Sequence, residues 1–216
     1  MPANRNISDE TPILLGTGNP SKQAALRWLL DGLPLNLTTP SQLGLADAPD
    51  ERGDTHYEIA KAKALDWSRS GSMLTIATDG GLVLPALGDA WESRYTHRFA
   101  GPKATNLQRL ERLLQLMKPF HGEQRRATWV EAMAIADRGE LLASWELNGA
   151  TGVIADKAAT VPESEGFWAF SVWYFPDLGK TYDQLSQELR EEIDDHWAQL
   201  RAKVREFFTH HWRTGP

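Results

Sequence analysis

The sequence contains no cysteine, which excludes a disulfide framework and any metal site built on thiolates. It also contains no run of the ~20 apolar residues that a membrane-spanning helix needs. The N-terminus is polar and lacks the apolar core of a secretory signal. We therefore expect a cytoplasmic protein with no membrane partner.

Positive charge is scarce as well, with 23 lysine and arginine residues against 29 aspartate and glutamate residues. The formal net charge of −6 argues against a nucleic-acid partner, because binding to a phosphate backbone needs a broad basic surface. A nucleotide can still bind through a few local cations. The apolar share of 41% is that of an ordinary globular chain and excludes a wholly disordered one.

No repeat or low-complexity linker divides the chain, so residues 1–216 are expected to form a single domain, with flexible ends at 1–10 and 211–216. Short apolar runs predict strands, and apolar residues spaced by three or four predict helices. Strands are expected at 13–15, 35–37, 73–77, 82–84, 128–136, 141–147, 152–154 and 172–175, and helices at 21–30, 55–70 and 106–117. The βαβ-like start and the antiparallel middle predict an α/β fold with a mixed sheet.

Two turns and one long helix complete this expectation. Thr78–Gly81 reads as a turn between two strands, and Asp137–Gly139 reads as the turn of a hairpin. The apolar spacing from Tyr182 to Phe207 predicts a long amphipathic helix, or two helices in line.

The first candidate site is the loop T-G-N-P-S-K at residues 17–22, between a predicted strand and a predicted helix. The N–H groups that open a helix are unpaired, and the helix dipole favours an anion there. Lys22 adds a mobile cation. The alternative is a plain strand–turn–helix junction with a surface lysine.

Two carboxylates are the next candidates. Asp79 ends an apolar strand, where open α/β sheets bind ligands, and two glycines after it allow a close approach. Glu51 precedes a predicted helix. The alternatives are an ordinary turn aspartate and a solvated glutamate that interacts with the helix dipole.

The remaining candidates lie toward the C-terminus. Arg98 can grip a phosphate with two hydrogen bonds, although it can equally be a surface arginine. The aromatic segment Gly166–Pro176 can stack on a nucleobase, or it can be core or an exposed dimer surface. His196 faces away from the apolar stripe of its helix, which predicts a solvated side chain.

Taken in order, these segments resemble the inosine triphosphate pyrophosphatase family, which removes non-standard purine nucleoside triphosphates. The resemblance covers about residues 12–205. It is carried by T-G-N-P-S-K, E-R-G-D-T-H-Y-E-I-A-K-A-K-A, A-T-D-G-G-L-V-L-P-A-L-G, Y-T-H-R-F-A-G and the aromatic segment with G-K-T-Y-D-Q-L behind it.

The resemblance implies a long mixed sheet flanked by helices, with two lobes around a central cleft, and a homodimer. It implies that water attacks the α–β phosphate linkage of a nucleoside triphosphate, releasing the monophosphate and pyrophosphate with Mg²⁺, or Mn²⁺, as cofactor. The physical chemistry agrees, because cations must neutralise the charge that builds up on the leaving pyrophosphate.

The same resemblance implies roles for individual residues. Asp79 and Lys22 would be catalytic, and Glu51 and Asp79 would hold the metal. The substrate would contact Thr17, Gly18, Asn19, Lys22, Lys63, Gly80, Arg98, Phe167, Arg190 and His196.

The chain departs from the family pattern mainly at the positions that recognise the nucleobase in the family. Phe170 stands in place of an aspartate that helps to read the base, and Asp194-Asp195-His196 stands where the family has S-H-R. Thr78 replaces the first acidic residue of the metal site. We therefore expect a retained pyrophosphohydrolase with an altered base preference. The alternatives are a nucleotide-binding module without turnover, or a phosphatase of a small phosphorylated metabolite.

Overall fold

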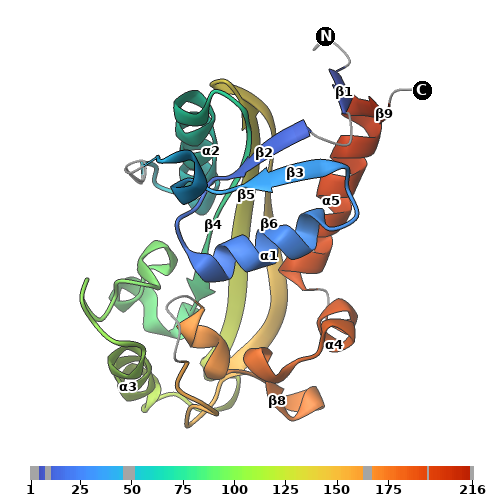
Figure 1. Ribbon diagram of the computed structural model, residues 1–216. Helices are drawn as coiled ribbons and strands as arrows, with labels where there is room; N and C mark the ends of the chain where they lie inside the picture. Colours follow the sequence, from blue (N-terminus) through green and yellow to red (C-terminus); the bar gives the residue numbers. More distant parts are fainter. Residues whose placement is uncertain (1–4, 8–10, 46–51, 163–166, 194, 215–216) are drawn as a thin grey trace. The chain divides into compact units, whose positions relative to one another are not determined.

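The computed structural model describes residues 5–7, 11–45, 52–162, 167–193 and 195–214. Its main sheet has seven strands (Figure 1). In spatial order these are β3 (Leu35–Thr38), β2 (Thr11–Leu15), β4 (Leu74–Val83), β5 (Arg126–Asp137), β6 (Glu140–Ile154), β7 (Trp173–Phe175) and β8 (Lys180–Thr181). Strand β2 pairs in parallel with β3 and β4, whereas β7 pairs antiparallel with β6 and β8. The sheet is therefore mixed, as the sequence predicts.

Helices flank this sheet, which confirms the expected fold class. They are α1 (Pro20–Leu30), α2 (His56–Gly71), α3 (Asn106–Met117), α4 (Gln187–Glu192) and α5 (His196–His211). Short strands β1 (Arg5–Ile7) and β9 (Trp212–Thr214) pair in parallel near the chain ends, where the sequence predicts flexibility. No helix among the described residues is long and apolar enough to cross a membrane.

The chain divides into two compact units. The first consists of residues 1–79, 132–147 and 197–216, and the second of residues 80–131 and 148–196. The boundary falls inside β4, between Asp79 and Gly80. The cleft between two lobes stays a prediction.

In the first unit, helix α2 packs on one face of the sheet. A Cβ atom on Gly16, directly after β2, would lie only 3.0 Å from both Thr75 Cγ2 and Trp67 Cδ1, so a glycine here allows the helix to approach. Ala64 of α2 packs with Ala77 of β4 in a cluster of buried alanines. Because side chains alternate along a strand, Thr75, Ala77 and Asp79 share the face that meets α2.

Helices α1 and α5 contact each other in the same unit. The Arg201 guanidinium of α5 lies 4.5 Å from the centre of the Trp28 ring of α1. Arg205 donates a hydrogen bond to the carbonyl oxygen of Asp31, directly after α1. The apolar side of α1 is buried as the sequence predicts, through Leu26, Leu29 and Leu30.

The predicted turn at Thr78–Gly81 is wrong, because β4 continues unbroken from Leu74 to Val83. The glycines serve close packing instead of a reversal of the chain. The predicted hairpin turn is confirmed: Arg138 and Gly139 have φ angles of 49° and 87° between β5 and β6. Two successive positive φ angles are typical of the type I′ turn that matches strand twist.

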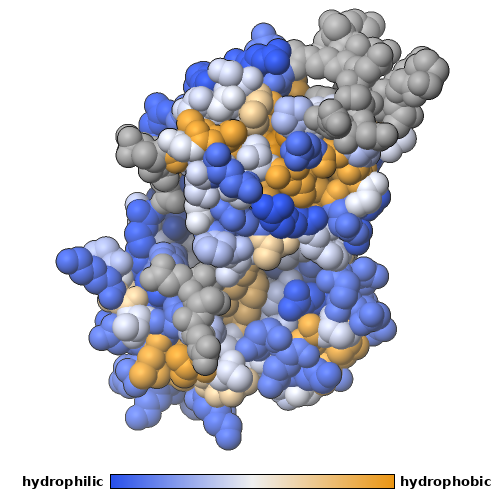
Figure 2. All heavy atoms as spheres, viewed as in Figure 1, coloured by the Kyte–Doolittle hydropathy of each residue, from blue (hydrophilic) through white to orange (hydrophobic). Residues whose placement is uncertain are grey.

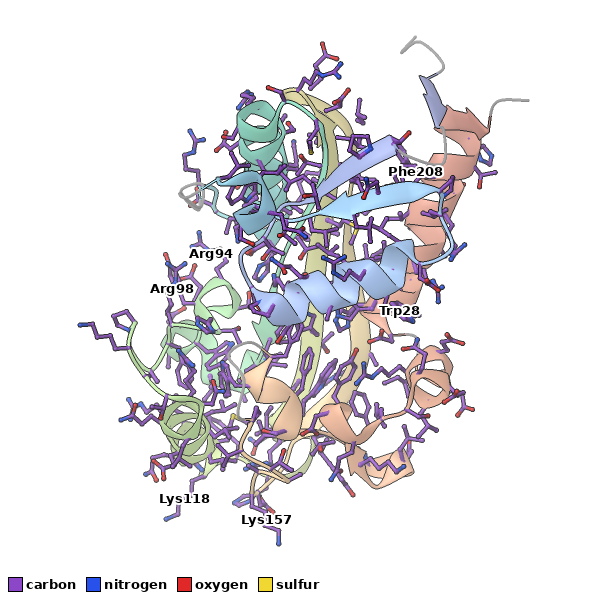
Figure 3. All side chains as sticks on the ribbon, in the orientation of Figure 1. Trp28, Arg94, Arg98, Lys118, Lys157 and Phe208 are labelled. Carbon is purple, nitrogen blue, oxygen red and sulfur yellow. The ribbon has the colours of Figure 1, made fainter. Side chains whose placement is uncertain are left out.

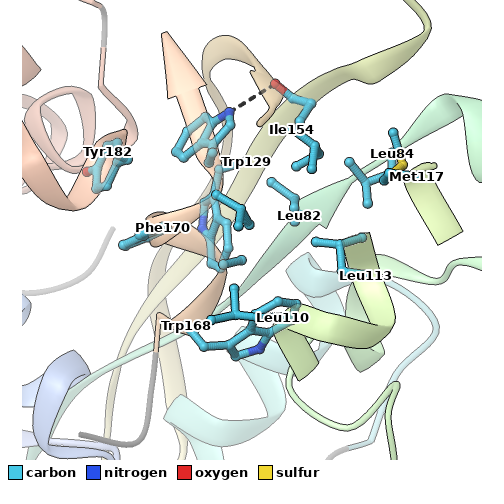
Figure 4. Close-up of a cluster of buried hydrophobic side chains, with 14 of the residues drawn as sticks. Leu82, Leu84, Leu110, Leu113, Met117, Trp129, Ile154, Trp168, Phe170 and Tyr182 are labelled. Atoms are coloured by element: carbon cyan, nitrogen blue, oxygen red, sulfur yellow. Dashed lines mark hydrogen bonds between the residues drawn. The ribbon is translucent and has the colours of Figure 1, made fainter. Parts of the chain in front are cut away.

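The second unit has an aromatic core. Trp129, Trp168, Phe170 and Tyr182 are buried together with Leu82 and Leu110 (Figure 4). Trp173 belongs to the same cluster. Of the alternatives predicted for the aromatic segment, core is therefore confirmed, and an exposed surface is wrong. The face seen in Figure 2 is mostly hydrophilic but also carries patches of apolar side chains.

The predicted long helix from Tyr182 to Phe207 is interrupted. A 3₁₀ turn covers Tyr182–Gln184, followed by α4 and then by α5. The second of the two expected arrangements, successive helices, is therefore closer to the structure.

Candidate functional site

Asp79 of β4 is the central residue of the candidate site among the residues that the structure describes. Strand alternation places its side chain toward α2, and the helix presents His56 and Lys63 on the side that meets the strand. These two residues are seven apart, which is about two helical turns, so they lie on one face of the helix. Only 8% of Asp79 is exposed.

Both carboxylate oxygens of Asp79 have a basic partner. Nδ1 of His56 lies 2.6 Å from Oδ2, and Nζ of Lys63 lies 2.8 Å from Oδ1. The resemblance assigns Lys63 to the phosphates, whereas the structure pairs its ammonium with this carboxylate.

Electrostatics fix the charge state of Asp79. Burial alone would raise the pKa of its carboxyl group, but the hydrogen bond from His56 and the charges of Lys22 and Lys63 outweigh burial. The net result is a pKa well below the ordinary value of aspartic acid. Asp79 is therefore ionised at physiological pH, and it is a weak proton acceptor.

The structure thus brings together three of the predicted site residues, Lys22, Lys63 and Asp79. Lys22 lies in the first turn of α1, close enough for its charge to act on the Asp79 carboxylate. Glu51, the other predicted metal ligand, lies outside the described residues. Thr78 is 1% exposed, and by strand alternation it lies on the face opposite to Asp79.

The loop at residues 17–22 differs from the expectation in one respect. Asn19 Oδ1 accepts hydrogen bonds from the N–H groups of Ser21 and Lys22, at 2.9 and 3.3 Å. Thr17 Oγ1 accepts a hydrogen bond from the N–H of Asn19, at 3.1 Å. The expectation of unpaired N–H groups at this helix start is therefore wrong for these residues, because the loop caps its own helix.

Two other features of this loop could still favour a bound anion: the open space at Gly18 and the positive charge of Lys22. Gly18 is exposed, and a Cβ atom at its position would meet nothing within 4 Å. The ammonium of Lys22 supplies the cation, so phosphate binding here would depend on that side chain more than on the helix N-terminus.

The two glycines after Asp79 are approached by protein atoms. A Cβ atom on Gly80 would lie 2.7 Å from the carbonyl oxygen of Val130 and closer still to the Glu131 carboxylate. A Cβ atom on Gly81 would lie 2.8 Å from the backbone carbon of Ser93. The expected close approach is real, but within the described residues it is made by neighbouring backbone and side chains, not by an open ligand surface.

A metal ion would find limited ligands in the described part of the chain. No group of three or more histidine, aspartate or glutamate side chains there could hold one. Mg²⁺ in proteins commonly uses only one or two carboxylates and keeps several waters. Each oxygen of Asp79 retains acceptor capacity beside its basic partner, so Asp79 fits this mode.

Three other predicted contacts belong to the second unit. Phe167 is half-buried, and its ring stacks parallel to Phe170 with centroids 4.7 Å apart. The Arg190 guanidinium lies 4.7 Å from the centre of the Tyr182 ring. Arg98 is exposed near the Tyr95 ring, and it projects beside Arg94 (Figure 3).

The prediction of a solvated His196 is wrong, because none of its surface is exposed. Its ring stacks near Trp129 with centroids 6.0 Å apart, and its Nδ1 lies 3.2 Å from Asp195 Oδ1. The Tyr182 hydroxyl donates to the same Asp195 oxygen at 2.6 Å. In this conformation His196 has no surface with which to contact a base.

The sequence analysis missed two buried polar contacts, Tyr182 with Asp195 and His56 with Asp79. Burial, together with the charge and the hydrogen bond of Asp195, raises the pKa of the Tyr182 hydroxyl far above its ordinary value, so this hydroxyl keeps its proton and donates it to the hydrogen bond. His56 was also missed. The available signal was its position seven residues before Lys63, because that spacing places both on the side of the helix that carries Ala60 and Ala64.

Comparison with known proteins gives consistent results. The profile of the Ham1 family matches residues 13–207. A dITP/XTP pyrophosphatase of Photorhabdus laumondii is 32% identical over 193 residues, covering 89% of this chain and 95% of that protein. Another dITP/XTP pyrophosphatase, from Thermus thermophilus, is 30% identical, covering 90% of this chain and 91% of that protein.

Solved structures show the same fold. A HAM1 protein from Coxiella burnetii superposes with a TM-score of 0.75 at 24% identity, covering 91% of this chain and 99% of that one. The Staphylococcus aureus Ham1 protein superposes with a TM-score of 0.71, also at 24% identity and with the same coverage.

Proposed function

Because this chain belongs to the Ham1 family, we propose that it hydrolyses a non-standard or modified nucleoside triphosphate to the monophosphate and pyrophosphate. At the level of reaction class it is a nucleotide pyrophosphohydrolase, a hydrolase acting on acid anhydrides. A Mg²⁺ or Mn²⁺ requirement, a homodimer and a cytoplasmic location belong to the same proposal.

One observation supports the proposal above the others: a buried, ionised aspartate lies among two lysines and a histidine. A triphosphate carries about four negative charges, and its cleavage builds further charge on the leaving pyrophosphate. Lys22 and Lys63 would bind and neutralise that charge. Asp79 and Glu51 would hold Mg²⁺, which when bound would offset part of the same charge.

The low pKa of Asp79 limits its role in the reaction. A carboxylate that holds its charge this firmly accepts a proton poorly. We therefore assign it the orientation of the attacking water, through an accepted hydrogen bond, together with metal binding. Its charge also offsets the positive charges of the two lysines in the resting site.

Base recognition is the part of the function that we propose to be altered. The ring of Phe167 already stacks on Phe170, and His196 is buried among aromatic rings. Phe170 offers no hydrogen bond to a base edge, and a pocket selects strongly only where its polar groups would otherwise stay unpaired. We expect weak discrimination between bases.

A triphosphate screen tests this function. Purine, pyrimidine and modified triphosphates are incubated with Mg²⁺ or Mn²⁺, and pyrophosphate and orthophosphate are measured separately. We expect pyrophosphate release from triphosphates that carry several different bases, with kcat/KM values within about 100-fold of one another. Binding without release would favour a nucleotide-binding module, and orthophosphate release alone would favour a phosphatase.

Lys22→Gln should lower kcat/KM for the best triphosphate by about tenfold or more. Hydrogen bonds to charged groups contribute ~1.5–3 kcal/mol, and this substitution removes the charge but keeps a polar side chain. Steady-state pyrophosphate release measures the effect. Arg27→Gln is the matched control, since Arg27 is an exposed cation in the last turn of the same helix. Equal effects of the two substitutions would contradict the role of Lys22.

A further inference from the structure

His56 is a buried histidine whose hydrogen bond to Asp79 is among the shortest side-chain contacts in the first unit. The residue is 5% exposed, and its Nδ1 lies 2.6 Å from Asp79 Oδ2. An ionised carboxylate can only accept a hydrogen bond, so Nδ1 must carry the proton. His56 therefore donates to Asp79.

The backbone that carries His56 is held on both sides. Thr55 Oγ1 accepts a hydrogen bond from the N–H of Glu58 at 3.1 Å and so caps the first turn of α2. The N–H of Tyr57 donates to Glu146 Oε2 at 3.0 Å, and the Tyr57 hydroxyl lies 2.7 Å from Ser144 Oγ. The Thr55 cap and the Tyr57 backbone N–H thereby fix the position of the His56 backbone, and the Tyr57 hydroxyl adds a separate contact between α2 and β6.

The two side chains that contact Asp79, Lys63 and His56, differ in conformational freedom. Lys63 reaches Oδ1 with a flexible four-carbon chain, and the resemblance assigns the same ammonium to phosphate. His56 has only two side-chain torsions and little room to move. When Lys63 turns to a substrate, the bond from His56 is the one that can still hold the carboxylate plane.

We infer that His56 is a positioning residue: its Nδ1–H fixes the Asp79 carboxylate so that the remaining lone pairs keep their direction toward the reacting phosphate. The inference rests on the proposed function. The terminal torsion of an aspartate is broad, so an unheld carboxylate would rotate. Groups that orient a first ligand typically contribute 10–100-fold to activity or metal affinity.

Two substitutions separate the hydrogen bond from the ring. His56→Phe keeps a ring of similar size but removes the donor, and His56→Asn keeps a donor near the Nδ1 position. We expect His56→Phe to lower kcat about 10–100-fold with KM within about threefold of the wild type, and His56→Asn to recover most of that loss. Tyr57→Phe is the control, because it removes a hydrogen bond to Ser144 from the same helical turn without touching Asp79.

A second readout does not depend on turnover. Nitrogen-15 NMR of the histidine rings should show a proton on Nδ1 of His56, with its resonance shifted by Asp79→Asn. Thermal melts show whether each variant folds. If His56→Phe does not fold, the inference is tested by the kcat of His56→Asn and by the NMR signal of the Nδ1 proton.

The outcomes are distinct. A wild type that releases pyrophosphate, together with a His56→Phe variant of unchanged kcat, overturns the inference and leaves the proposed function intact. Equal loss of kcat in Tyr57→Phe also overturns it, because the effect would then be a general loosening of the helix start. A wild type with no turnover overturns the proposed function, and with it the role of His56 in the reaction. An Nδ1 without a proton overturns the geometric basis.

Discussion

Asp79→Asn is expected to lower kcat by about 10²–10³-fold or more, a larger loss of activity than we expect from Lys22→Gln or His56→Phe. Asparagine keeps the shape of the side chain but removes its charge, so under the proposed function the site loses both a metal ligand and the group that orients water. Lys22, Lys63 and His56 would then face a neutral amide. Steady-state release of pyrophosphate at saturating substrate measures the loss.

Asp66→Asn is the matched control for this substitution. Asp66 also lies on α2 and also pairs with two cations, Arg52 and Arg69, but both arginine side chains are largely exposed at 66% and 57%. Exposed ion pairs contribute ~0–1 kcal/mol, so its activity should remain close to the wild type. Activity retained in Asp79→Asn would show that the reaction does not use this carboxylate.

The same variant has a pH-dependent effect on stability. The pKa of Asp79 is lowered in the folded protein, so its contribution to the free energy of unfolding is fully present above about pH 4, the ordinary value of aspartic acid. The contribution is lost as the pH falls below that value. Denaturant unfolding should therefore give a smaller difference between wild type and Asp79→Asn at pH 3 than at pH 7.

Gly81→Ala is expected to destabilise the protein by about 3 kcal/mol or more. Gly81 is buried, and a Cβ atom there would lie 2.8 Å from the backbone carbon of Ser93, 2.9 Å from Thr96 Oγ1, and closest to the Ser93 carbonyl oxygen. Backbone atoms cannot swing aside as a flexible side chain can. The Leu82 N–H, which donates to Thr96 Oγ1 at 3.0 Å, would be displaced too.

Thermal unfolding measures this loss as a fall in the melting temperature of roughly 6–12 °C for a protein of this size. Gly18→Ala is the control, because a Cβ atom at Gly18 meets nothing within 4 Å. A Gly81→Ala variant with the melting temperature of the wild type would mean that β4 is not packed as the structure shows.

The sequence predicted the elements that depend on local patterns. The apolar run before Thr17, the apolar spacing that predicts a helix at 55–70 and the turn at Arg138–Gly139 all specify their structure through nearby residues. The sequence also singled out Asp79 as a candidate, because an acidic residue after an apolar strand is a local signal. The family resemblance then joined Lys22, Lys63 and Asp79, which the structure brings together.

The errors share a different physical origin. The glycines at 80 and 81 favour a turn locally, but packing against β5 residues and the Ser93 backbone keeps them in a strand. His196 lies beside a polar run, yet aromatic rings from distant segments bury it. The partnership of His56 with Asp79 spans 23 positions, so the spacing of His56 and Lys63 could indicate the helix face that His56 shares but not its partner on β4.

The ion pair between Lys63 and Asp79 also bears on substrate affinity. In the resting protein this ammonium already has a counterion inside the molecule. An arriving polyphosphate would have to displace it, so binding is an exchange of one anion for another on the same lysine. The measured affinity then reports the difference between two ion pairs, and a variant that weakens the internal pair can bind nucleotide more tightly while turning it over more slowly.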